Sequence, residues 1–110
     1  MSEPYFVDWA DHPRRDIFPG VHVAIVDGEH LMLSRVELDP RAEVPEHQHP
    51  HEQYGLVLKG DAVFTIGGQT RHLQAGEYYT IPGGVPHRVL TGGDGAVCLD
   101  IFSPPREDYR

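Results

Sequence analysis

The chain is 110 residues long and 39% hydrophobic, which is enough for one domain with a modest core. Its formal net charge of −8 argues against nucleic-acid binding, because phosphate contacts need clustered Lys and Arg. No apolar run is long enough to span a bilayer, and the first residues lack the basic start and apolar stretch of a signal peptide. We therefore expect a cytoplasmic protein that contacts neither nucleic acid nor membrane.

Glycine and proline divide the chain into short segments that alternate between apolar and polar residues. A single helical turn is predicted over residues 9–15. Asp27-Gly28 and Gly67-Gly68 have the composition of hairpin turns. Short strands at regular turn spacing are typical of a β-sandwich or barrel, so the sequence predicts an all-β fold. The predicted strands cover residues 21–26, 31–36, 53–58, 62–66, 77–81, 87–90 and 96–102.

A histidine-rich run is the strongest chemical signal in the chain. On a strand, His47 and His49 would point to the same face, with His51 and Gln53 in phase with them. His87 follows a Pro- and Gly-rich turn that begins a new strand. Neutral nitrogen and oxygen donors suit a borderline or hard divalent metal. The sequence predicts that one sheet face supplies two or three ligands and a neighbouring strand supplies the last.

These residues also have interpretations that involve no metal. A histidine-rich surface loop would explain the run, although it explains neither the period of two nor the later histidine. Gln53 could hydrogen-bond to a water or a histidine instead of binding metal. His51 is expected to lie outside the ligand set, because Pro50 disturbs regular strand geometry.

A second candidate site lies near the C-terminus. Asp100 stands in an apolar run, where a carboxylate is costly unless it is paired or functional. Phe102 is two residues further along the same predicted strand and therefore shares its face. Taken alone, Phe102 would be assigned to the core and Arg106 to a solvated tail. Tyr78 and Tyr79 could line the interior or its rim, and the sequence does not choose between them.

Two motifs resemble those of the cupin family. His47-x-His49-x3-Gln53-x6-Gly60 is similar to the first cupin motif, with Gln53 where Glu is usual, and Gly76-x5-Pro82-x-Gly84-x2-His87 is similar to the second. Thr91 stands where the second motif usually closes with Asn. The resemblance implies a single-domain conical β-barrel of the jelly-roll type with the metal inside it. This domain would cover residues 19–110, after an N-terminal segment (1–18) that forms a short turn or a swapped strand.

A narrower resemblance is to the KdgF family of pectin-degradation proteins. It rests on residues 49–53 and on the C-terminal run 100–109, and it includes Gln53 in place of the usual Glu. The family opens the ring of 4,5-unsaturated monouronates, which pectate and alginate lyases release, to give linear 4-deoxy-5-keto-uronate. The resemblance implies an isomerase acting on a small anionic sugar, and a homodimer, because small cupins commonly pair their sheets.

The same resemblance assigns roles to residues. Asp100 would be the proton shuttle, and Arg106 and Phe102 would be further active-site residues. The metal ligands would be His47, His49, Gln53 and His87, holding a divalent ion (Ni, Zn, Mn, Fe or Co) that the sequence does not identify.

Two rival functions remain open at this point. One is another metal cupin enzyme such as a dioxygenase, although those sites usually include a carboxylate and this chain has Gln53. The other is a non-catalytic module that binds a sugar or small acid without converting it.

Overall fold

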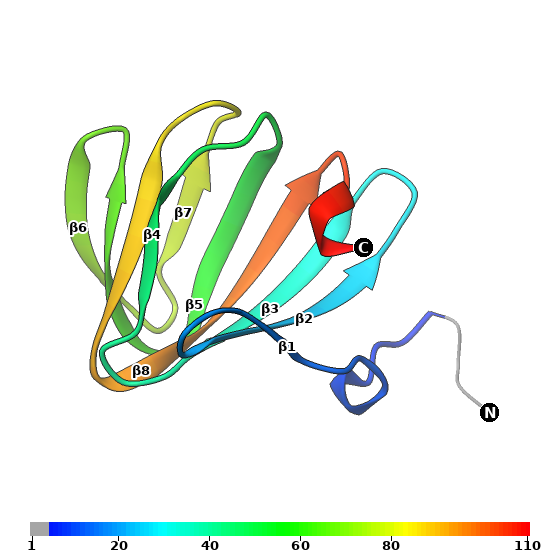
Figure 1. Cartoon of the computed structure of the whole chain (residues 1–110), viewed down its shortest axis with the longest axis horizontal. Coiled ribbons are helices and arrows are strands. Elements are labelled where there is room, and N and C mark those ends of the chain that lie inside the picture. The colour runs from blue at the N-terminus through cyan, green and yellow to red at the C-terminus, as the bar shows by residue number, and fades with distance from the viewer. Residues whose placement is uncertain (1–4) are drawn as a thin grey trace.

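The computed structural model describes residues 5–110, and nearly all of its regular structure is β-strand (Figure 1). This confirms the all-β prediction. Two short 3-10 turns, η1 (Trp9–Asp11) and η2 (Glu107–Tyr109), lie near the chain ends. Within residues 5–110 there is no helix with the length and apolar character needed to cross a membrane. The strands are β1 (Arg15–Phe18), β2 (Val21–Asp27), β3 (Met32–Leu38), β4 (Glu43–His47), β5 (Glu52–Ile66), β6 (Gln69–Gln74), β7 (Tyr78–Ile81) and β8 (His87–Ser103).

The long strands β5 and β8 organise the fold. Residues 52–60 of β5 pair with residues 96–103 of β8, and residues 62–66 of β5 pair with residues 87–91 of β8. Strands β3, β2 and β1 extend the first half of this pair, and β7 pairs with β5 there; β4 and β6 flank the second half. Each half of the bent β5–β8 pair, together with the strands that flank it, forms one arm of the fold. The first arm holds β1, β2, β3 and β7, and the second arm holds β4 and β6. The two arms meet at the lower end of Figure 1 and separate towards the upper end.

The inner faces of the arms form the hydrophobic core. Side chains alternate along each strand, so residues two apart share the inner face. Val57 and Phe64 on β5, for example, are 0% and 3% exposed and come from the two halves of that strand. The members of the core cluster are Val21, Leu38, Ala42, Val57, Ala62, Phe64, Leu73, Tyr79, Ile81, Ala96 and Cys98.

Two pairs of predicted strands are single strands in the structure. The segments 53–58 and 62–66 join as β5, because register shifts beside Lys59 and Gly60 bend the strand without ending it. The segments 87–90 and 96–102 join as β8 through residues that the sequence indicated as a turn. The glycines within β5 and β8 therefore mark bends in continuous strands, and they do not mark strand ends.

Two strands, β1 and β6, were absent from the prediction. β6 has one buried residue, Leu73, and otherwise exposed positions, so it lacks the apolar alternation that indicates a strand. β1 is likewise exposed or half-buried. The turn joining β5 to β6 was predicted correctly: Ile66 pairs with Gln69 across Gly67 and Gly68, whose φ values of 56° and 80° suit a type I′ hairpin.

The N-terminal segment folds onto its own chain. β1 pairs antiparallel with β2, and the predicted turn over 9–15 is the shorter η1. Residues 1–4 lie outside the described residues. The boundary between residues 18 and 19 stays a prediction.

Candidate metal and active site

His47 and His87 face each other across two strands. His47 ends β4, His87 begins β8, and the two residues are register partners. Their ring centroids are 4.3 Å apart. The prediction that a neighbouring strand brings His87 to the histidine run is confirmed in its geometry.

His49 reaches the same point from a loop. β4 ends at His47, so the strand predicted through His49 is wrong, and residues 48–51 form the connection to β5. The Gly84 N–H donates to the His49 carbonyl at 2.8 Å. A Cβ on Gly83 would lie 2.4 Å from the Pro50 carbonyl oxygen, so this turn needs glycine to approach the loop. The turn of the second motif thus holds His49 beside His87, with ring centroids 4.9 Å apart.

All three imidazoles are oriented by their own backbone. The Nδ1 atoms lie 2.9 Å from the Pro45 oxygen for His47 and 2.9 Å from the Val85 oxygen for His87. The Nδ1 atom of His49 lies 3.1 Å from the His51 oxygen. A carbonyl only accepts, so each Nδ1 carries a proton, and the atom left to bind a ligand in each ring is Nε2. One ligand atom from each of the three residues lies within 4.8 Å of the others.

Two of these histidines are kept neutral by their surroundings. Burial lowers the pKa of His87 to about 4. Burial, followed by the positive charge of Arg106, lowers the pKa of His49. Their lone pairs are therefore available near neutral pH, as metal binding requires.

Gln53 completes the donor set. Its Oε1 lies 3.0 Å from the Nε2 of His49. Burial raises the pKa of Asp100, and a hydrogen bond with Gln53 partly opposes that rise. Because a carboxylate accepts only, the amide NH2 of Gln53 faces Asp100 and its oxygen faces His49. Two acceptors then meet at hydrogen-bond distance, an arrangement that a cation would stabilise.

The residues fit a divalent metal ion. The Nε2 of His87 is buried and has no hydrogen-bond partner, which is unfavourable unless a ligand occupies its lone pair. Three nitrogens and one amide oxygen form a neutral set that suits Zn, Ni, Mn, Fe or Co. His51 is outside this cluster, since it is not among the residues whose ligand atoms lie within 4.8 Å of one another.

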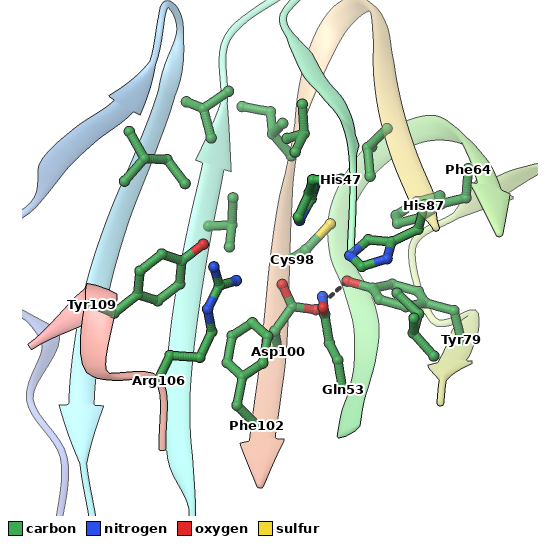
Figure 2. Close-up of a pocket in the computed structure, with 17 residues that line it drawn as sticks. His47, Gln53, Phe64, Tyr79, His87, Cys98, Asp100, Phe102, Arg106 and Tyr109 are labelled. Atoms are coloured by element: carbon green, nitrogen blue, oxygen red, sulfur yellow. Dashed lines mark hydrogen bonds between the residues drawn. The ribbon is translucent and has the colours of Figure 1, made fainter. Parts of the chain in front are cut away.

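Asp100 lies beside the cluster on β8. It is 6% exposed, and the Tyr79 hydroxyl donates to its Oδ1 at 2.6 Å (Figure 2). Burial raises the pKa of Asp100 to about 6, while Tyr79, Gln53 and Arg106 act to lower it. The carboxyl group can therefore take up and release a proton near neutral pH.

Arg106 is held from three sides. Its guanidinium carbon lies 4.0 Å from the Tyr109 ring centroid and 5.1 Å from that of Phe102. Its Nε and Nη2 donate to the Asp108 carboxylate at 3.1 and 2.6 Å. The guanidinium points into the cavity that Asp100 and Gln53 also line (Figure 2). The C-terminal run is thus an ordered wall, in contrast to the frayed tail that composition alone indicates.

Two neighbouring spaces lie beside these groups. An inner cavity of about 50 Å³ contains His47, His87, Asp100 and Arg106 in its walls. A groove of about 470 Å³ between β1 and the C-terminal turn shares His47, Arg106 and Tyr109 with it. The groove has the volume of ordinary small-molecule sites, and it borders the inner cavity at these shared residues.

The structure brings together every site residue that the sequence indicated, while their roles stay predictions. His47, Gln53, His87, Asp100, Phe102 and Arg106 line the inner cavity, and His49 packs against Phe102 with ring centroids 5.6 Å apart. Tyr79 and Tyr109 also line it, and the sequence did not assign them. Tyr79 could have been assigned, because it is two residues from the apolar Ile81 and so shares its buried face.

A model of the cupin domain family matches residues 34–102. The chain therefore belongs to the cupin family, as a small single-domain member, which confirms the resemblance drawn from the two motifs. The matched region includes all four candidate metal ligands, Asp100 and Phe102.

Similar proteins cover nearly the whole chain. The pectin degradation protein KdgF of Dickeya dadantii (strain 3937) is 30% identical over 107 residues, which is 96% of both chains. The solved structure of KdgF from Halomonas sp. has a TM-score of 0.88 at 28% identity and covers 99% of this chain and 100% of that one. An RmlC-like cupin from Shewanella frigidimarina NCIMB 400 has a TM-score of 0.90 at 28% identity, covering 98% and 97%.

Replacing His87 with Ala should remove most of the bound divalent metal, because the remaining donors leave one coordination position empty. Elemental analysis of the purified protein after dialysis measures this. His72→Ala is the matched control, since His72 is an exposed residue on β6 paired with Asp61. Equal metal content in the two variants would contradict the assignment of the cluster.

Proposed function

We propose that the protein is a metal-dependent isomerase that opens the ring of 4,5-unsaturated monouronates to give linear 4-deoxy-5-keto-uronate. The observation that carries the proposal is the position of the buried Asp100 carboxylate, which shares one cavity with the three-histidine cluster and Arg106. The similarity to KdgF proteins along nearly the full chain supports the substrate class.

The reaction needs one proton to move and no oxidant. The bond between carbon 1 and the ring oxygen breaks as the C1 hydroxyl loses its proton and becomes an aldehyde. The electron pair stays on the former ring oxygen, giving an enolate across carbons 4 and 5. Carbon 4 then gains the proton, and the enolate becomes the neutral C5 ketone.

Asp100 has the properties that this transfer needs. Tyr79 holds one of its oxygens, and its raised pKa allows it to accept a proton and then release it. We assign it the removal of the C1 hydroxyl proton and its delivery to carbon 4. Asp100 would therefore act first as the base and then as the acid.

Arg106 and Phe102 would bind the substrate. The Nε and Nη2 atoms of Arg106 are used by Asp108, and its Nη1 edge can donate to the uronate carboxylate. Phe102 is 2% exposed and lies between the Arg106 guanidinium and the His49 ring, so that its face borders the cavity. Both residues fix the sugar relative to Asp100, and proximity of this kind lowers the barrier.

A divalent ion held by His47, His49, Gln53 and His87 would supply Lewis acidity towards the oxygen that gains negative charge. The chain contributes no charge to that ligand set, so the full ionic charge faces the substrate. The inner cavity is too small for a whole hexuronate, and we place most of the sugar in the larger groove. The cytoplasmic location stays a prediction.

We also propose that the active form is a homodimer. The outer face of the first arm is apolar where solvent-facing strands are ordinarily polar. Tyr54 and Tyr78 are 52% and 73% exposed there, and Tyr54 pairs with Ile101, which in turn pairs with Leu33. A second copy of the chain would cover this continuous face.

Asp100→Asn should lower kcat by about 10²–10⁴-fold, the usual contribution of general acid–base help, while metal content stays that of the unaltered protein. The assay follows loss of the ultraviolet absorbance of the conjugated double bond in lyase-derived monouronate. Normal turnover by this variant would show that another group moves the proton.

Arg106→Lys should raise KM by about tenfold or more, because an ammonium cannot reproduce the planar donor edge that binds a carboxylate. Arg110→Lys is the control, since Arg110 pairs with Asp27 away from the cavity. Initial rates over a range of monouronate concentrations separate KM from kcat. An unchanged KM would remove Arg106 from the substrate site.

Tyr54→Lys should weaken self-association about tenfold or more, since it places a charge on the apolar face. Sedimentation analysis over a concentration series measures the change. Gln69→Lys, an exposed substitution on β6, should have no effect. A monomeric unaltered protein at micromolar concentration would exclude the dimer.

A further inference from the structure

Three residues on neighbouring strands form a row across the floor of the cavity. Gly55 of β5 is the register partner of Tyr79 on β7 and also of Asp100 on β8. All three positions face inward, and Tyr79 and Asp100 are 7% and 6% exposed. The tyrosine therefore reaches the carboxylate by crossing over Gly55. Figure 2 shows the bond between the Tyr79 hydroxyl and Asp100.

The tyrosine ring is fixed as well as its hydroxyl. Its centroid lies 4.4 Å from that of Phe64, in a tilted stack within the core. The hydroxyl donates to Oδ1 of Asp100 at 2.6 Å, the short distance of a hydrogen bond to a charged acceptor. Burial raises the pKa of Tyr79 well above its ordinary value, so the hydroxyl keeps its proton and acts as a donor.

Gly55 is needed for space and not for backbone conformation. A Cβ at this position would lie 2.3 Å from the Asp100 Oδ1 and 2.5 Å from two atoms of the Tyr79 ring. Its φ lies in the range that other residues adopt, in contrast to Gly60 and its φ of 75°. The missing side chain is therefore what lets the phenol and the carboxylate meet.

We infer that Tyr79 is a positioning residue for Asp100: its hydroxyl holds one carboxylate oxygen, through the gap left by Gly55, so that the other oxygen is presented to the substrate. This inference rests on the proposed function. If Tyr79 were only structural, its hydroxyl would supply a hydrogen bond to a buried carboxylate and stabilise the fold, but it would not affect the rate of the chemical step.

Tyr79→Phe removes only the hydroxyl and keeps the ring packed on Phe64. The expected result is a fall in kcat of about 10- to 100-fold with KM changed less than about twofold, because a hydrogen bond to a charged group is lost without loss of a substrate contact. Rates are normalised to bound metal and measured well below the unfolding temperature, so that loss of folded protein does not contribute. Tyr5→Phe is the matched control, since the Tyr5 side chain is 89% exposed and lines neither the cavity nor the groove, and it should leave both constants unchanged.

Gly55→Ala tests the same contact from the other side, with the hydroxyl left in place. It should lower kcat as Tyr79→Phe does, whereas Gly93→Ala should have no effect, because a Cβ on Gly93 meets no atom within 4 Å. The 13C carboxyl resonance of Asp100, identified by its loss in Asp100→Asn, provides a readout without substrate. The resonance should shift in Tyr79→Phe and not in Tyr5→Phe.

The outcomes separate the two claims. If the unaltered protein turns over the monouronate and Tyr79→Phe has the same kcat, Tyr79 does not position Asp100. An unshifted Asp100 resonance in Tyr79→Phe would also overturn the inference. If the unaltered protein, loaded with metal, does not accelerate ring opening, the proposed function itself fails.

Discussion

The site depends on one electrostatic constraint: the lone pairs of several side chains converge on one point in the cavity wall. Each of His47, His49 and His87 donates through Nδ1 to a carbonyl only two residues away in the chain. The rings are therefore oriented by local backbone geometry before any ligand arrives. With the Gln53 oxygen added, the cluster gathers acceptors and supplies no proton to pair with them. A cation resolves this conflict, and the rest of the site is arranged around that position.

Gln53 connects the two halves of the site. Its oxygen faces the histidines and its NH2 faces Asp100, so a glutamine in place of a carboxylate avoids a second negative charge beside Asp100. Two carboxylates this close would raise each other's pKa values strongly. With glutamine at this position, Asp100 keeps a pKa of about 6, and the charge of a bound cation would not be reduced by this ligand.

The sequence predicted the site better than it predicted the strands. Strand periodicity placed Asp100 and Phe102 on one face of the sheet. The two motifs placed His47 beside His87, because each motif is a short local pattern and the family resemblance links the two. β1 and β6 escaped detection because their residues are mostly exposed, so that hydrogen bonding and not apolar alternation defines them. The sequence also did not show that the C-terminal run is held in a fixed position. It depends on distant contacts, such as the bidentate pair between Arg110 and Asp27, that no local pattern shows.

The central claim is that the cavity with its metal performs the ring opening. The most direct test follows loss of the ultraviolet absorbance of the unsaturated monouronate with metal-loaded, chelated and reloaded protein. The account predicts ring opening faster than the spontaneous reaction with the loaded and reloaded samples, and the spontaneous rate with the chelated one. No acceleration by protein that holds about one divalent ion per chain would contradict the account. Equal acceleration by the chelated protein would contradict the role of the metal.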